Sequence, residues 1–302
     1  MVKSTLGRSD RDRRLGAVDE YRRGLYSVTP AWVGDGEPPV VFGTAPWGRA
    51  KIVRGGITQR HLDLLDCIRA TAEHRLSDSS GQTHLIFDDA EVRKKLGKGR
   101  GRWRDVREML RDFMTTIVQI EGRTPGAWGI EFSLATKIGD TDLAAPRRAD
   151  TFPACLRRLV LSAEYTAFLT ALPSVSYSPT VLDRVLALHH LVSRAIARWC
   201  LSHTNDQHHP LDVVLAALGV VDEGEAIAGR AARSSVRRLV GHVHEDAAGL
   251  AELGITITSA FLHYKRLPGV FIRVPGASPG AESGARACRT RRQSVPNPAP
   301  GL

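Results

Sequence analysis

A chain of 302 residues with 42% apolar residues is long enough for two domains with their own cores. Its 42 Lys and Arg residues exceed its 32 Asp and Glu residues, and the resulting formal net charge of +10 is typical of a protein that binds nucleic acid. No apolar run approaches the roughly 20 residues needed to cross a bilayer, and the N-terminus lacks the apolar core of a signal peptide, so we expect a cytoplasmic protein.

The chain changes character near residue 50. Residues 1–50 are rich in Arg, Gly and Pro, so we expect an extension with at most a short helix near residues 15–26. A regular pattern then begins with a short strand at residues 51–53 and a helix over residues 57–73, which carries apolar residues at helical spacing. Residues 83–87 alternate apolar and polar side chains, which predicts a small strand.

Two aspartates and a glycine bound the next predicted helix. Asp88 or Asp89 can cap its N-terminus by accepting from free amides, and Gly97 can end it in a left-handed conformation. Helix caps are a better interpretation of this carboxylate pair than acid/base catalysis. Gly97, Gly99 and Gly101 suggest a phosphate-binding loop, but no Gly-Lys-Ser/Thr follows, so the sequence does not support nucleotide hydrolysis.

The helix that follows is strongly basic. At about 100° per residue its apolar residues form one stripe, and its arginines project from the other side if the helix extends back to Arg100. Between Glu91 and Arg111, nine Lys and Arg residues stand against three acids, a local balance of +6. An ordinary surface helix with a solvated basic face shows the same pattern. The apolar stripe is Val106, Met109, Leu110 and Phe113, and the basic side is Arg100, Arg104, Arg107 and Arg111.

The residues after the basic helix favour a more specific interpretation. Residues 117–121 and 129–134 alternate like half-buried strands, and residues 122–128, which contain Gly and Pro, are typical of a loop. Helix, turn, basic helix and β-hairpin in that order predict a winged helix-turn-helix. Trp103 and Trp128 lie beside this unit, where each can either stack on bases or pack locally.

The second half repeats this order of elements. A long amphipathic helix is predicted over residues 181–200, and a short helix over residues 211–218 begins after Pro210 and ends at Gly219. A second basic helix matches the first at a constant offset of 130 residues. The matching residues are Val236, Leu239, Val240, Val243, Arg230 and Arg237, and Arg233 and Arg238 add charge.

A second wing is predicted after this helix. Residues 255–264 and 270–274 are typical of strands, and the turn between them places Lys265 and Arg266 at its tip. Two independent copies of one pattern strengthen the interpretation of both. Residues 276–302 are rich in Pro, Gly, Ser and Ala, so we expect a disordered basic tail.

The predicted fold class is mainly α with small β-wings, an α+β protein made of two tandem winged helix-turn-helix domains. A polar, Pro-containing stretch over residues 139–152 marks the expected separation between them. The expected parts are the N-terminal extension (1–50), the first winged-helix domain (51–140), a connector (141–175), the second winged-helix domain (176–275) and the tail (276–302).

This tandem arrangement resembles the plasmid replication initiators, which bind repeated sites at a plasmid origin. The resemblance covers about residues 51–275 and rests on element order, on the helix start and glycine stop of residues 87–97, and on the closing strand over residues 269–274. It implies binding to direct repeats in duplex DNA, opening of an AT-rich segment, recruitment of the host replicative helicase and repression of the protein's own promoter, often as a dimer. In that family the N-terminal unit commonly carries dimerisation as well as DNA contacts. We expect no cofactor and no enzymatic activity.

Two histidine patterns indicate other chemistries. His242 and His244 match the metal signature of rolling-circle nicking enzymes, but residues two apart on a helix are separated by about 200°, so their imidazoles diverge. A second set has spacings that a zinc site uses, but it lacks a fourth-ligand motif, so polar loop histidines are the better interpretation. That set is Cys200, His203, His208 and His209. A winged-helix transcriptional regulator is the alternative within the same fold.

The residues expected to contact duplex DNA are cations of the two basic helices and of the second wing. Arg233 and Arg237 are expected to read bases, whereas Lys265 and Arg266 are expected to hold phosphates. The full set is Lys98, Arg100, Arg102, Arg104, Arg107, Arg111, Arg230, Arg233, Arg237, Arg238, Lys265 and Arg266.

Overall fold

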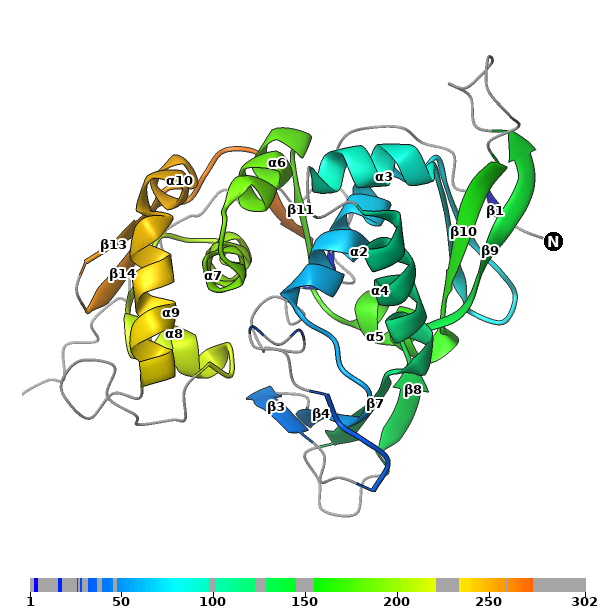
Figure 1. Cartoon of the computed structure of the whole chain (residues 1–302), viewed down its shortest axis with the longest axis horizontal. Helices are drawn as coiled ribbons and strands as arrows, with labels where there is room; N and C mark the ends of the chain where they lie inside the picture. Colours follow the sequence, from blue (N-terminus) through cyan, green and yellow to red (C-terminus); the bar gives the residue numbers. More distant parts are fainter. Residues whose placement is uncertain are drawn as a thin grey trace, which may run out of the picture.

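The fold combines α-helices with several antiparallel sheets, in two halves that lie side by side (Figure 1). This confirms the α+β class, although strands form a larger part of the fold than expected. No helix in the described part of the chain is long and apolar enough to cross a membrane. The computed structural model describes residues 3–4, 16–17, 26, 28, 32–36, 40–45, 48–97, 102–122, 129–144, 155–220, 234–258 and 260–273.

The N-terminal half follows the predicted order of helix, strand, helix, basic helix and hairpin. Its elements are β1 (Lys3–Ser4), β2 (Gly16–Ala17), β3 (Val40–Ala45), β4 (Gly48–Arg54), α2 (Gln59–Thr71), β5 (His74–Ser77), β6 (Thr83–Phe87), α3 (Asp89–Leu96), α4 (Trp103–Thr115), β7 (Ile117–Gly122), β8 (Ile130–Ser133), β9 (Ala135–Ala144) and β10 (Cys155–Leu161). The predicted caps of α3 are confirmed. The Asp88 carboxylate accepts from the Ala90 amide at 2.8 Å, and Gly97 ends the helix with a φ of 83°.

Two antiparallel sheets accompany these helices. The β7–β8 hairpin continues a four-stranded sheet of order β3-β4-β7-β8, and β6 lies inside a five-stranded sheet of order β1-β5-β6-β10-β9. Up to residue 144, the stretch expected as a linker is β9, paired along its length with β10. Because β9 is an edge strand with one face exposed, it accepts the polar residues that suggested a linker. Residues 145–154 lie outside the described part.

The chain before residue 50 contributes to the core instead of forming only an extension. Tyr26, Val28 and Val33 are buried, and the Tyr26 hydroxyl is hydrogen-bonded to the Tyr165 hydroxyl at 3.0 Å. The Gln59 side chain donates to the Tyr26 carbonyl at 2.8 Å. Most of the predicted helix near residues 15–26, and the tail over residues 276–302, lie outside the described residues.

The C-terminal half begins in the segment expected as a connector. Its elements are α5 (Ala163–Ala171), β11 (Ser174–Tyr177), α6 (Pro179–Ala187), α7 (Leu191–Leu201), β12 (Gln207–Pro210), α8 (Leu211–Ala217), α9 (Ser234–Glu245), α10 (Ala247–Glu252), β13 (Ile255–Ile257), β14 (Phe261–Tyr264) and β15 (Val270–Arg273). The single helix predicted over residues 181–200 is wrong, because the chain leaves the helical path between α6 and α7. There the amides of His189 and His190 donate to the Asp246 carboxylate, at 3.0 and 2.9 Å.

The second wing differs from the prediction. β13 and β14 form the hairpin, which turns between Ile257 and Phe261, and β12 pairs with the other edge of β14. β15 pairs with β11 in a separate sheet, because β11 presents a complementary edge after α5. Lys265 and Arg266 therefore do not lie at a wing tip. They follow β14 at the end of the hairpin opposite its turn.

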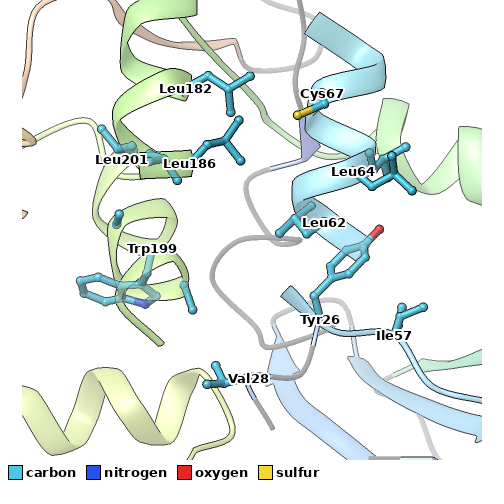
Figure 2. Close-up of a cluster of buried hydrophobic side chains, with 14 of the residues drawn as sticks. Tyr26, Val28, Ile57, Leu62, Leu64, Cys67, Leu182, Leu186, Trp199 and Leu201 are labelled. Carbon is cyan, nitrogen blue, oxygen red and sulfur yellow. The ribbon is translucent and has the colours of Figure 1, made fainter. Parts of the chain in front are cut away.

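α2 and α7 join the two halves across a buried interface. Figure 2 shows buried apolar side chains from both halves in this region, among them Leu62 on α2 and Leu186 on α6. Buried charges from α2 and α7 pair in the same interface. Arg198 donates to Asp66 at 3.0 Å and to Asp63 at 2.7 Å, and Arg194 is paired with Asp63. Each of these side chains is at most 4% exposed, so the α2–α7 ion network is shielded from solvent.

Candidate nucleic-acid interface

α4 has the two faces that its sequence predicts. Its apolar stripe, from Val106 to Phe113, is buried, whereas Arg104, Arg107 and Arg111 are exposed. With about 100° per residue, these three arginines fall within about 60° of one another on the helix surface. α4 begins at Trp103, so the exposed Arg102 precedes the helix. The result is a stripe of arginines on the outer face of α4.

A histidine that the sequence analysis did not single out holds α4 against α2. His61 Nδ1 accepts from the Thr58 amide at 3.0 Å, so the proton of the neutral ring lies on Nε2, which donates to Asp112 on α4 at 3.0 Å. The same ring packs edge-on against Phe113, with 5.7 Å between ring centres. The Thr-x-x-His spacing at the start of α2 resembles a capping box and is the signal that predicts this role.

The positive charge of this face is only partly neutralised. Arg104 donates to Glu108 at 3.0 Å, one turn along the helix, and this hydrogen bond raises the pKa of Arg104. Asp105 lies 3.8 Å from Arg60 on α2, and Asp112 is paired with His61. Within the described residues, no carboxylate pairs with Arg107 or Arg111. These two arginines are therefore the best placed on α4 to meet an anionic partner.

α9 presents the second basic surface. Val236, Leu239 and Val243 are buried as the match to α4 predicts, and Arg237 and Arg238 are exposed. The predicted Val240 is only partly buried, although it packs against the core. Lys98, Arg100, Arg230 and Arg233, and the side chains of Trp103 and Trp128, lie outside the described set.

Asp246 fixes the end of α9 next to the break between α6 and α7. Burial disfavours its charged form, but the amides of His189 and His190, a hydrogen bond from Ser193 and the nearby His190 ring together lower the pKa of the Asp246 carboxyl. The His190 ring stacks on His242 of α9, with 4.0 Å between ring centres and 6° between planes. No local sequence signal predicts this role for Asp246, because its partners lie more than 50 residues earlier in the chain.

Lys265 and Arg266 are exposed but belong to a different surface from the one expected. The Lys265 amide donates to the Gly254 carbonyl and the Arg266 amide to the Asp206 carboxylate, both at 2.8 Å. Their backbone is therefore fixed beside the start of β13. In Figure 1, α4 and α9 lie on opposite sides of α2 and α7, so the described arginines of α4 are separated from Arg237 and Arg238 of α9 by these two helices.

The described residues contain no group of three or more His, Cys, Asp or Glu side chains suited to a metal ion. His242 is partly buried against His190 whereas His244 is exposed, which agrees with the predicted divergence of the two imidazoles. Cys200 is fully buried, and burial raises the pKa of its thiol, which opposes the thiolate that zinc requires. His203 Nδ1 instead donates to the Trp199 carbonyl at 2.7 Å.

Comparisons with known proteins give one distant likeness. No protein-family model matches the sequence, and no curated protein matches it. The fold is similar to a crystal structure of domains 2 and 3 of RctB, with a TM-score of 0.45 and 14% sequence identity over 87% of this chain and 96% of that chain. At this TM-score the likeness is too weak to assign a function or the roles of residues. Both are inferred from the side chains of this chain.

Proposed function

We propose that this chain is a plasmid replication initiator of the tandem winged-helix type. It binds repeated sites in duplex DNA at the origin through α4 and α9, recruits the host replicative helicase and represses its own promoter, with a homodimer as an additional form. The protein acts by binding and needs neither a cofactor nor a catalytic residue.

One observation carries this proposal: each half holds an amphipathic helix with a buried apolar side and exposed arginines. The His61–Asp112 pair fixes α4, and the contacts of Asp246 fix the end of α9. Neither helix can therefore rotate about its axis and turn its basic face towards the core. The α2–α7 ion network joins the two halves. Two basic helices on one frame suit a duplex, because a recognition helix can enter a major groove and a second can enter another groove one or more turns away.

The charges on these helices make separate contributions to affinity and to specificity. An arginine that donates both its N–H groups to guanine O6 and N7 discriminates that base by about 1–3 kcal/mol. Contacts with phosphates release counterions, so binding through both halves predicts a slope of log affinity against log salt of about −6 to −10. A slope near −2 would exclude engagement of both halves at once.

A matched set of alanine variants tests the interface. Arg107→Ala and Arg237→Ala remove one exposed charge from α4 and α9, and Arg184→Ala removes one from α6, outside both basic helices. Binding of each purified variant to origin repeats and to single-base variants of those repeats is measured at two salt concentrations. We expect both helix variants to lose affinity relative to Arg184→Ala, and Arg237→Ala to lose discrimination at one base position.

Two results would contradict this reading of the helices. If Arg107→Ala and Arg237→Ala bind like Arg184→Ala, the proposed interface is wrong. If Arg237→Ala weakens binding to every site equally and lowers the salt slope, α9 contacts the backbone instead of reading bases. Lys265→Ala is expected to show that second behaviour, with a slope change of about one, because Lys265 is proposed to hold phosphate.

The two alternatives are separated by simple assays. A winged-helix transcriptional regulator represses its promoter but does not support replication of a plasmid that carries the gene and its flanking repeats. A nicking enzyme converts supercoiled plasmid into nicked circles in the presence of a divalent metal, which we do not expect here. The diverging His242 and His244 side chains favour the binding protein over the nicking enzyme.

A further inference from the structure

The outer face of the β12-β14-β13 sheet carries two histidines that no DNA-binding role uses. Side chains alternate along β14, so Leu262 and Tyr264 are buried whereas Phe261 and His263 are exposed. His208 on β12 lies directly opposite His263 in the strand register and is also exposed. The two imidazoles therefore stand next to each other on one solvent-facing surface.

The two rings approach each other through their Nδ1 atoms. His208 Nδ1 and His263 Nδ1 lie 2.8 Å apart, and 4.2 Å separates the ring centres. Phe261 stacks on His208, with 5.1 Å between ring centres and 12° between planes, and this limits rotation of the imidazole. Both histidines belong to paired strands, so their Cα positions are fixed by the sheet. Two nitrogen donors are thus presented together on a rigid frame.

We propose that His208 and His263 form a two-histidine binding site for a divalent transition-metal ion of tetragonal geometry, Cu²⁺ or Ni²⁺. An ion that bonds both Nδ1 atoms at about 2.0–2.1 Å, with those atoms 2.8 Å apart, subtends an angle of about 84–89°. That angle is the one between neighbouring ligands of a square-planar or octahedral ion. A tetrahedral ion needs a separation of about 3.3–3.4 Å at the same bond length, so the pair suits Zn²⁺ less well.

The neutral pair can exchange the hydrogen bond between its rings for a metal ion. In the neutral pair one Nδ1 carries the proton and donates it to the other Nδ1, which accepts. When an ion binds both Nδ1 atoms, that proton leaves Nδ1 and the same ring takes one up at Nε2, so the neutral pair loses no net proton. The ion replaces the hydrogen bond between the rings. Water completes the coordination, since the described residues offer no group of three ligands.

The site is tested with the untagged full-length chain and inorganic Ni²⁺ or Cu²⁺. Ni²⁺ binding is measured by calorimetry for the wild type, His208→Gln, His263→Gln and the double variant. His244→Gln, an exposed histidine on α9, is the matched control. Loss of either ligand is expected to weaken binding at least about tenfold, since even outer-shell partners are worth about 10–100-fold. The double variant should bind at least as weakly as either single variant, because each single variant keeps one imidazole donor and the double variant keeps neither.

A spectroscopic measurement keeps the test independent of affinity. With one equivalent of Cu²⁺, electron paramagnetic resonance of the wild type should show two coordinated nitrogens, and each single variant should show one. Far-UV circular dichroism checks that the exposed substitutions leave the fold intact. The proposal is overturned if a single variant binds Ni²⁺ like the wild type, if His244→Gln weakens binding equally, or if the Cu²⁺ spectrum shows a single nitrogen.

Discussion

Replacing Arg198 with methionine is the sharpest test of the joint between the two halves. In the interface the guanidinium donates to Asp66 at 3.0 Å, to Asp63 at 2.7 Å and to the Gln59 side chain at 3.3 Å. Methionine fills similar volume but leaves two buried carboxylates with fewer partners. Breaking a buried pair on one side costs about 3–5 kcal/mol. Because Asp63 keeps Arg194 and Asp66 keeps Arg69 at 3.9 Å, we expect the free energy of unfolding to fall by about 3 kcal/mol.

The assay is urea unfolding followed by tryptophan fluorescence; one of the five tryptophans, Trp199, follows Arg198 in α7. Arg184→Met removes an arginine whose ion pair with Glu252 is exposed, and it should change the free energy of unfolding by less than about 0.5 kcal/mol. A cost below about 1 kcal/mol for Arg198→Met, or a cost no larger than that of Arg184→Met, would refute this account of the interface.

Two further predictions concern single positions. Gly254→Ala should destabilise the fold by at least about 1 kcal/mol more than Gly219→Ala, measured by urea unfolding: both have positive φ, but a Cβ at Gly254 meets a backbone carbonyl whereas Gly219 faces open space. Hydrogen bonds from Ser80 and then His84 lower the pKa of Asp78 to about 2, below its unfolded value of about 3.9. Its contribution to stability is therefore present above pH 4 and lost as the pH falls towards 2. Between pH 5 and pH 3, the midpoint temperature of thermal unfolding should therefore fall less in Asp78→Ala than in the wild type.

Short-range signals predicted much of the N-terminal half. Asp88 and Gly97 mark the ends of α3 because capping depends on neighbouring residues alone. The spacing of apolar residues likewise predicted which side of α4 is buried. The arginine stripe of α4 follows from the same periodicity. The part of the candidate interface on α4 can therefore be predicted from the sequence.

The features that escaped prediction depend on distant partners. The apolar spacing of residues 181–200 continues through the break between α6 and α7, and the break depends on Asp246, more than 50 residues away. β15 was expected to pair with the strand before it, but its register with β11 spans about a hundred residues. The His208–His263 pair arises in the same way, since the two histidines become neighbours only when β12 pairs with β14. Local patterns do not contain these pairings.

The α2–α7 ion network also constrains how this chain can change over evolutionary time. Asp63, Asp66, Arg194 and Arg198 lie up to 135 residues apart in the sequence, and they form ion pairs with one another in the folded chain. Replacing one of them first leaves a buried charge with fewer partners, and breaking a buried pair on one side costs about 3–5 kcal/mol of a total stability of only about 5–15 kcal/mol. Descendants of this sequence should therefore keep all four residues or exchange them together for apolar ones, and the two helices should covary.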